Sequence, residues 1–343
     1  KKALTDAAVE AALSKLDPHS TYMPPQVREE SDNSLAAGFD GIGIQFNVPN
    51  DTAVVIESIP GGPAQKCGVL AGDRLLMVDD VNIAGVHYPQ DSMVRRMKGP
   101  AGTKVKVTVK RDGEVIPFEI TRGKIPMHSV DAAFMTSATD GYVRVSKFSR
   151  STYEEFVKAI AGLRAQGMEH LVVDLRDNSG GYFDQALMMS NLFLPKDSLI
   201  VFLEGRKRAR EDYRADGRGP YQDLPVSLLI NEGSASSSEI FAGALQDNHR
   251  ATIVGRRSFG KGLVQEPINF TDGSGIRLTV ARFHTPSGRC IQKPYTEDYA
   301  FEVYKRYAGS EMVQKDSMKI ENGGIIPDVF VPLDTTRASD FYI

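Results

Sequence analysis

Three segments of the sequence place small residues beside side chains that could do chemistry. In the first, an apolar run over 225–230 leads through a turn of small residues to Ser236 and then to a helical pattern over 237–248. Ligands of α/β folds bind at the carboxyl ends of the strands, where this serine would lie. The amide of the next residue, Ser237, could help to stabilise a tetrahedral oxyanion. The alternative is structural, because Ser236 and Glu239 also fit a capping box.

The second segment places Lys261 between Gly260 and Gly262, an unusual setting for a solvated lysine. Glycines permit close backbone packing, and a lysine desolvated by such packing has a lowered pKa. Its neutral amine can then act as a general base, and serine with a lysine base is a known catalytic arrangement. The competing interpretation is an exposed loop lysine. A conventional triad through His284 is less favoured, because no helical turn defines that histidine as a partner.

The third segment runs from an apolar strand over 171–175 through Asn178 to the paired glycines Gly180 and Gly181. Such a turn leaves backbone N–H groups unpaired at a helix N-terminus, where negative charge is stabilised. This favours an anion site or oxyanion hole, with a plain strand–turn–helix junction as the alternative. The spacing and the lysine of a phosphate-binding loop are missing, which argues against a nucleotide site.

The remaining reactive side chains give no comparable pattern. None of the six histidines has metal-ligand spacing, so we expect no metal site and no cofactor. Cys67 and Cys290 lie in different modules, and two buried thiols are the simplest interpretation. With 41 Lys+Arg against 44 Asp+Glu, the formal net charge of −3 gives no indication of a nucleic-acid partner.

The elements that must position the three segments alternate along the second half of the chain. Strands are predicted over 141–147, 171–175, 199–202, 225–230 and 251–254, and helices over 151–166, 182–194 and 237–248. A hairpin is expected around Asp272-Gly273. This alternation predicts an α/β core.

The first part of the chain has a different texture. Residues 4–17 have apolar residues at helical spacing, and Asp17-Pro18-His19-Ser20 breaks the pattern. From Gly38 onwards, short β runs alternate with glycine turns, including a hairpin over 104–120 and helices over 63–67 and 90–97. The 343 residues, at about 150 per domain, therefore divide into an N-terminal helical segment (1–36), a β-rich domain (37–124) and an α/β core (125–343).

Taken together, these segments resemble the carboxy-terminal processing peptidases, or tail-specific proteases. The resemblance rests on the stretches 175–181, 231–240 and 259–265, with further matches at 16–20, 285–289 and 323–328. It implies that Ser236 is the nucleophile, that Lys261 is the general base and that Gln265 orients the lysine amine. It also implies an oxyanion hole at Gly180 or Gly181 with the amide of Ser237. The family commonly has alanine at position 237, where this chain has serine.

The β-rich module resembles the PDZ domain that these proteases carry. The stretch that contains Phe39, Gly41, Ile42, Gly43 and Ile44 matches the carboxylate-binding loop. Successive backbone N–H groups of such a loop capture a C-terminal carboxylate, while the peptide tail adds to a sheet edge. The helix over 90–97 should form the other wall of the groove. The alternative is a β module that only packs against the core.

The resemblance implies a serine endopeptidase that cleaves proteins near their C-termini through an acyl-enzyme. A catalytically silent PDZ scaffold is the main alternative, and another hydrolase or a carrier of hydrophobic ligands is the third. The family usually works in the bacterial periplasm or cell envelope and can form homodimers. The chain begins at Lys1 rather than Met, so a signal peptide or membrane anchor lost from the N-terminus is compatible with the sequence.

Overall fold

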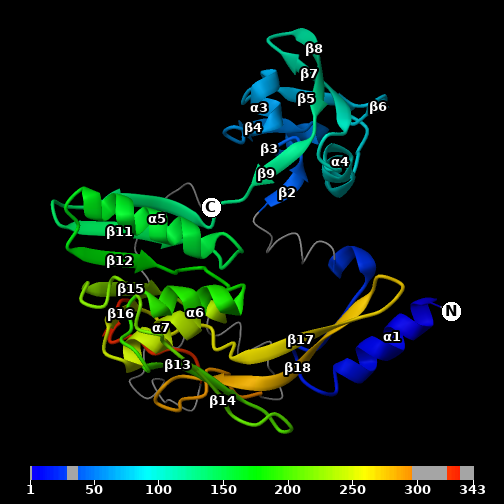
Figure 1. Ribbon diagram of the computed structural model, residues 1–343. Helices are drawn as coiled ribbons and strands as arrows, with labels where there is room; N and C mark the ends of the chain where they lie inside the picture. Colours follow the sequence, from blue (N-terminus) through cyan, green and yellow to red (C-terminus); the bar gives the residue numbers. More distant parts are fainter. Residues whose placement is uncertain (1, 29–37, 296–322, 333–343) are drawn as a thin grey trace. The chain divides into compact units, whose positions relative to one another are not determined.

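The computed structural model describes residues 2–28, 38–295 and 323–332 (Figure 1). Their contacts divide the chain into two compact units, one formed by Lys1–Leu35 with His128–Ile343 and the other by Ala36–Met127. The larger unit thus combines the segment before the β-rich unit with the segment after it. In each unit the apolar side chains form a separate buried core.

A six-stranded sheet forms the centre of the larger unit, in the order β10-β11-β12-β15-β16-β19. The bounds are β10 Val130–Met135, β11 Asp140–Val145, β12 His170–Asp174, β15 Val226–Ile230, β16 Ala251–Gly255 and β19 Val329–Phe330. The β10–β11 pair is antiparallel and the other pairs are parallel. The carboxyl ends of β12 and β15 therefore meet at one edge, where the glycine and serine turns follow.

Within the described ranges, three helices pack along this sheet: α5 (Thr152–Ala165), α6 (Phe183–Asn191) and α7 (Ser237–Asp247). Figure 1 shows α6 and α7 between the six-stranded sheet and a second sheet, and α7 contacts both β16 and, in the second sheet, β13 (Leu199–Glu204). In the helical layer between the two sheets, the rings of Phe156, Phe193 and Phe241 contact one another edge-on or tilted, with centroids 6.2 to 6.4 Å apart. The α/β core that the alternating pattern predicts is confirmed.

The second sheet has the order β1-β18-β13-β14, with β17 also paired to β18. Its strands are β1 (Thr21–Met23), β13 (Leu199–Glu204), β14 (Glu211–Arg214), β17 (Leu263–Asn269) and β18 (Gly275–His284). The long β17–β18 hairpin starts two residues after Lys261, and β1 adds to it antiparallel, with Thr21 opposite Arg277. The N-terminal segment that contains β1 therefore pairs with the hairpin that follows Lys261.

The first helix, α1, is shorter than the sequence predicts. It spans Lys2–Leu13, whereas the apolar spacing indicates a helix up to residue 17. Leu16 is 63% exposed, so the last apolar residue of the pattern does not face a core. Asp17 instead accepts hydrogen bonds from the backbone N–H groups of His19 and Ser20, which closes a tight turn.

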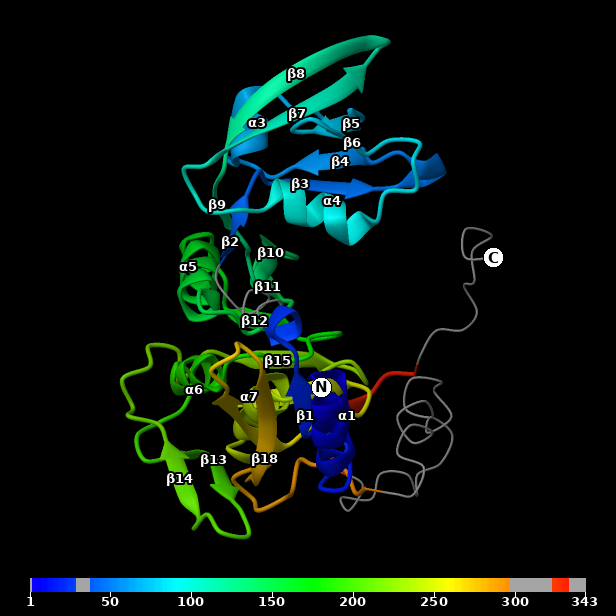
Figure 2. The ribbon, with the colours of Figure 1, turned by 90° about the vertical axis from the view of Figure 1, so that its right-hand side faces the viewer.

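The smaller unit is a β-rich fold with two helices, α3 (Pro63–Cys67) and α4 (Gln90–Met97). Its main sheet contains β3 (Ile44–Asn47), β4 (Val54–Ser58), β5 (Arg74–Val78), β6 (Val81–Asn82), β7 (Lys104–Arg111) and β8 (Glu114–Thr121), and a short 3-10 helix covers Pro49–Asp51. A separate pair joins β2 (Gly38–Gly41) to β9 (Gly123–Pro126). Figure 2 shows α4 beside β3. The predicted hairpin over 104–120 and the predicted helices over 63–67 and 90–97 are confirmed.

Candidate active site

Ser236 lies at the N-terminus of α7 in a strained backbone conformation. Its φ of 55° and ψ of −116° are unusual for a residue other than glycine. Such a conformation costs on the order of 1–3 kcal/mol and persists only where the surroundings enforce it. Strain of this kind gathers at functional sites, and the turn of a nucleophilic serine from strand into helix is a known example.

The side chain of Glu239 joins the turn at Ser236 to the loop that carries Lys261. Its carboxylate is fully buried and accepts four hydrogen bonds. Oε2 accepts from the N–H groups of Ser236 and Lys261, at 2.8 Å each. Oε1 accepts from Gly260 N–H at 2.7 Å and from the Ser258 hydroxyl at 2.5 Å. The two segments that the sequence singles out for a nucleophile and a base are therefore in contact through one carboxylate.

A further backbone bond closes the same junction, because Phe259 N–H donates to Ser234 O at 2.9 Å. Burial raises the pKa of Glu239, while the four donors around it act in the opposite direction. The sequence identifies Glu239 only as the partner of Ser236 in a capping box. Its contacts with 258–261 depend on tertiary packing, and no local pattern indicates them.

Lys261 lies partly buried beside this junction. Burial lowers the pKa of its amine, the positive charge of Arg277 lowers it further, and Glu239 acts in the opposite direction. The direction is the one that a general base needs, because only the uncharged amine can accept a proton. The structure therefore gives Lys261 the desolvated setting that its flanking glycines suggest.

Gln265 lies on β17, at a β-bulge between Val264 and Gln265. Its side-chain Nε2 donates to His19 O at 2.8 Å. His19 belongs to the turn after α1, and burial together with the charge of Lys261 lowers the pKa of its imidazole to about 4. The sequence treats Asp17 to Ser20 as a helix breaker and gives no signal for its place beside Lys261.

The paired glycines pack directly against the serine turn. Gly180 has φ 97°, and a Cβ there would lie 2.7 Å from Ser236 Cβ and 2.9 Å from Ser237 N. Gly181 has φ 148°, and a Cβ there would lie 2.1 Å from Phe148 O. Both positions therefore need glycine for close approach as well as for conformation.

The amides of the glycine turn are not equivalent. Gly180 N–H donates to Asn178 Oδ1 at 2.9 Å, so this amide already has a partner. Asn178 O in turn accepts from Ala235 N–H and from the Ser238 hydroxyl, at 2.9 Å each. Asn178 thus connects the glycine turn to the serine turn, which leaves Gly181 and Ser237 as the amides to consider for an oxyanion.

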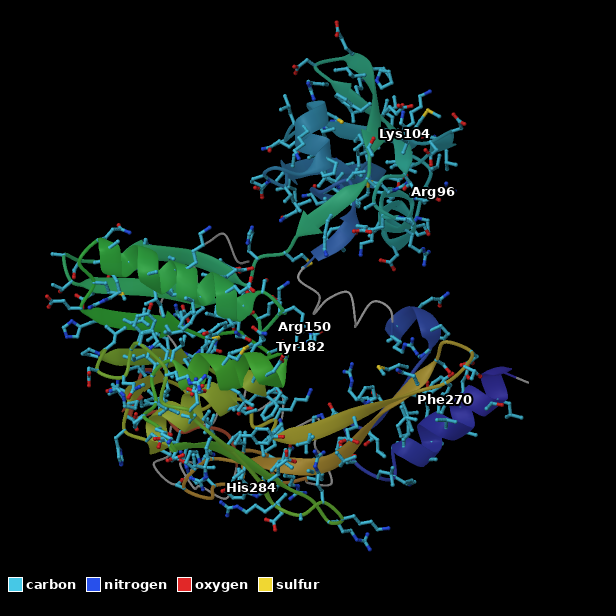
Figure 3. All side chains as sticks on the ribbon, in the orientation of Figure 1. Arg96, Lys104, Arg150, Tyr182, Phe270 and His284 are labelled. Carbon is cyan, nitrogen blue, oxygen red and sulfur yellow. The ribbon has the colours of Figure 1, made fainter. Side chains whose placement is uncertain are left out.

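The hydroxyl of Ser237 takes part in packing. It donates to Gly181 O at 3.0 Å, and the residue is 1% exposed. The first turn of α7 is thereby attached to the glycine turn. At the other side of that turn, Arg150 stacks on the Tyr182 ring at 3.7 Å, and Figure 3 shows the two side chains together.

The other reactive side chains lie in different settings. His284, at the end of β18 in Figure 3, stacks on Phe202 with ring centroids 4.8 Å apart, and burial lowers its pKa. Cys67 is exposed, against the expectation of a buried thiol, and Cys290 is partly buried; both are free thiols. Within residues 2–28, 38–295 and 323–332, no cluster of three or more His, Cys, Asp or Glu side chains could hold a metal ion. No helix of those same ranges has the length and apolar character to cross a bilayer.

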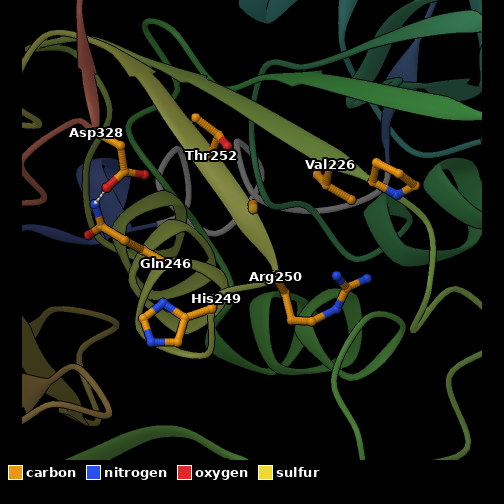
Figure 4. Close-up of a pocket in the computed structure, with 8 residues that line it drawn as sticks. Val226, Gln246, His249, Arg250, Thr252 and Asp328 are labelled. Carbon is orange, nitrogen blue, oxygen red and sulfur yellow. Dashed lines mark hydrogen bonds between the residues drawn. The ribbon is translucent and has the colours of Figure 1, made fainter.

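A cavity lies at the opposite edge of the sheet, where β15 and β16 begin. It has a volume of about 400 Å³, and its wall includes His249, Arg250 and Asp328 (Figure 4). Asp328 accepts from Gln246 Nε2, and Arg250 donates to backbone carbonyls of neighbouring loops. These polar groups thus have structural partners, and the cavity is separate from the Ser236 edge.

The β-rich unit has an apolar pocket of about 60 Å³ between its first loop and α4. Ile42, Gly43 and Ile44 form one wall, and Val94 and Met97 of α4 form the other. The loop is sterically fixed, because Gly43 has φ 76° and a Cβ there would lie 2.8 Å from Ile125 Cδ1. Phe39 also lines the pocket, with Lys98 Nζ 4.9 Å above its ring centroid.

Comparison with known proteins identifies both units. Residues 140–301 match peptidase family S41, and residues 41–121 match the PDZ domain. The chain is similar to the carboxy-terminal-processing protease of Bartonella bacilliformis, with 38% identity over 297 residues that cover 84% of this chain and 67% of the relative. It therefore belongs to the carboxy-terminal processing proteases of peptidase family S41, with a PDZ domain.

Two further comparisons agree with this family. A solved photosystem II D1 C-terminal processing protease matches with a TM-score of 0.53 and 28% identity, over 96% of this chain and 82% of that one. A probable CtpA-like serine protease of Staphylococcus epidermidis is 34% identical over 84% of this chain. The chain spans 58% of the length of that relative.

Proposed function

We propose that this chain is a serine endopeptidase that cleaves proteins near their C-termini, with Ser236 as nucleophile and Lys261 as general base. The observation that supports this most directly is the shared carboxylate of Glu239, which accepts from the backbone N–H groups of both residues. The strained backbone of Ser236 and the lowered pKa of Lys261 support it independently.

The proposed reaction has two halves. The neutral amine of Lys261 takes the proton of the Ser236 hydroxyl as the serine oxygen bonds to the scissile carbonyl carbon. The amides of Gly181 and Ser237 would hold the resulting oxyanion. The C–N bond then breaks, and the Lys261 ammonium returns its proton to the leaving amine. In the second half, Lys261 deprotonates a water that attacks the acyl ester, and the serine regains its proton.

A catalytically silent scaffold and a carrier of hydrophobic ligands are the competing functions. Incubation with casein, followed by mass spectrometry of the products, separates them. We expect peptides from the wild-type chain and none above background from Ser236→Ala or Lys261→Ala. Cleavage by either variant at a near wild-type rate would reject the assignment of that residue.

We further propose that the PDZ domain binds the C-terminal tails of substrates or gates the active site. The pocket between 42–44 and α4 is small and apolar, which suits the side chain of a terminal residue. A peptide with a free carboxylate should bind more tightly than its amidated form. Gly43→Ala should remove this preference, because its Cβ would meet Ile125. Equal binding of both peptides would contradict the carboxylate role.

Location and assembly are proposals as well. The family suggests an extracytoplasmic site in bacteria, and a membrane anchor and a homodimer remain predictions. Leu4 of α1 is 78% exposed, so it is a suitable position at which to test for an interface. Sedimentation of the wild-type chain and of Leu4→Asp tests the dimer. We expect the wild-type chain to dimerise as its concentration rises and Leu4→Asp to remain a monomer. A wild-type chain that is a monomer at all concentrations would refute the dimer.

A further inference from the structure

The turn formed by Asp17, Pro18, His19 and Ser20, here named the 17–20 loop, contacts the strand that carries Gln265. Gln265 Nε2 donates to His19 O at 2.8 Å. A carbonyl oxygen can only accept, so this bond fixes which end of the Gln265 amide faces the loop. The amide oxygen of Gln265 is then the end left for a donor such as the Lys261 amine.

The loop is organised by the carboxylate of Asp17. Its Oδ1 accepts from His19 N–H at 2.8 Å and from Ser20 N–H at 2.9 Å, and the Ser20 hydroxyl donates to Oδ2. Hydrogen bonds to these backbone groups hold the peptide units on either side of His19 in place. The position of His19 O therefore depends on the Asp17 carboxylate.

The same loop is attached to the strand opposite Gln265. Thr279 is the cross-strand partner of Gln265 in the β17–β18 hairpin. Its hydroxyl donates to Asp17 Oδ1 at 3.2 Å, and its N–H donates to the Ser20 hydroxyl oxygen at 3.1 Å. The loop thus contacts both residues of one cross-strand pair, on the hairpin that begins two residues after Lys261.

We propose that the 17–20 loop positions the general base, by holding Gln265 so that its amide oxygen orients the Lys261 amine towards Ser236. The inference rests on the proposed function and deepens it. Asp17 is then a positioning residue that acts through His19 O and Gln265 and does not touch the substrate. One consequence is that residues preceding the PDZ domain in the chain complete an active site formed by residues that follow it.

A double-mutant cycle on the full chain tests this pathway. Gln265→Ala and Asp17→Ala should each lower kcat for a fluorogenic peptide on the order of tenfold, with KM little changed, because positioning acts on the chemical step. The double variant should be no slower than Gln265→Ala alone, since both changes break one pathway. Rate losses that multiply, or a change confined to KM, would overturn the inference.

Two variants separate positioning from general damage to the N-terminal segment. Asp17→Asn keeps an oxygen that can accept from the loop N–H groups, so it should recover part of the lost kcat. Asp6 lies on α1, outside the loop, and accepts a hydrogen bond from the Tyr22 hydroxyl. Asp6→Ala removes this acceptor and should leave kcat unchanged. A loss of kcat in Asp6→Ala equal to that in Asp17→Ala would refute a specific role for the loop.

A measurement that does not depend on activity distinguishes this inference from the proposed function. With glutamine side chains labelled with ¹⁵N, the Gln265 amide is assigned by its loss in Gln265→Ala. Its hydrogen exchange should be slow in the wild-type chain and fast in Asp17→Ala. Unchanged exchange in Asp17→Ala with an inactive Lys261→Ala would overturn the inference and leave the proposed function standing. Full activity in Lys261→Ala would reject the proposed function, and with it the base that the loop is inferred to position.

Discussion

The backbone N–H groups of Ser236 and Lys261 donate to the same atom, Oε2 of Glu239, at 2.8 Å each. The two nitrogens can therefore be no further apart than twice that distance. The 24 residues between Ser236 and Lys261 in the sequence do not fix this proximity, which depends on contacts of a buried carboxylate with both segments. We therefore expect Glu239 to be needed for the site to form.

Glu239→Gln is expected to weaken the fold and to abolish activity together. The carboxylate accepts from four donors, whereas a glutamine amide would turn N–H groups towards some of them. Leaving buried donors unpaired should lower the free energy of unfolding by about 2–4 kcal/mol. Urea denaturation measures this, with Glu232→Gln as a control in a more accessible ion pair with Arg256. Equal losses in the two variants would contradict the special role of Glu239.

The pH dependence of cleavage should report the charge around Lys261. Burial and then Arg277 lower the pKa of its amine, so kcat/KM should rise with pH as the amine loses its proton. Arg277→Gln removes a positive charge, which raises the pKa of Lys261 and moves the acidic limb to higher pH. Arg214→Gln, on the edge strand β14, should leave the limb in place. A limb that stays in place in Arg277→Gln, or moves to lower pH, would contradict the electrostatic account.

The stability of the chain should depend on His19 in mildly acidic solution. Burial lowers the pKa of this imidazole to about 4, against about 6.5 in an unfolded chain. Between these values the unfolded state binds the proton and the folded state does not, so stability falls as the pH falls from about 6.5 to 4. The contribution is limited to a few kcal/mol, since each pKa unit corresponds to about 1.4 kcal/mol. Urea titrations at both pH values should show a smaller fall in the free energy of unfolding for His19→Gln than for the wild-type chain. An equal fall in the two proteins would refute the role of His19.

Ser237→Ala tests the hydroxyl that distinguishes this chain from the common family pattern. The variant removes the bond to Gly181 O and should lower the free energy of unfolding by about 1 kcal/mol. The backbone amide remains, so acylation should slow by less than about tenfold. A complete loss of cleavage would mean that the hydroxyl takes part in the reaction rather than in packing.

Much of the fold can be read from the sequence because its signals are local. The apolar runs at 171–175 and 225–230, the Asp-Gly hairpin at 112–113 and the helix over 90–97 each appear in the structure. The edge strands β10 and β14 were not predicted, since many of their residues are exposed and lack a continuous apolar run. The end of α1 was wrong because Leu16 follows the apolar spacing without being buried.

Only part of the candidate site can be predicted from the sequence. The sequence indicates close packing at the glycines around Lys261 and before α6, and the structure shows it at Gly262, Gly180 and Gly181. The roles of Glu239 and Asp17 arise from contacts between segments far apart in sequence, as in the bond from Thr279 to Asp17. No periodicity or turn signal encodes such contacts, so they required the folded chain.

Covalent labelling of Ser236 across a range of pH tests the central claim most directly. A serine-directed phosphonate, followed by mass spectrometry of the peptide that contains residue 236, measures how strongly the hydroxyl is activated. The account predicts an adduct at Ser236 that forms faster as the pH rises, and a rate at least about 100-fold lower in Lys261→Ala. Labelling of Lys261→Ala at the wild-type rate, or an adduct on another residue in place of Ser236, would contradict it.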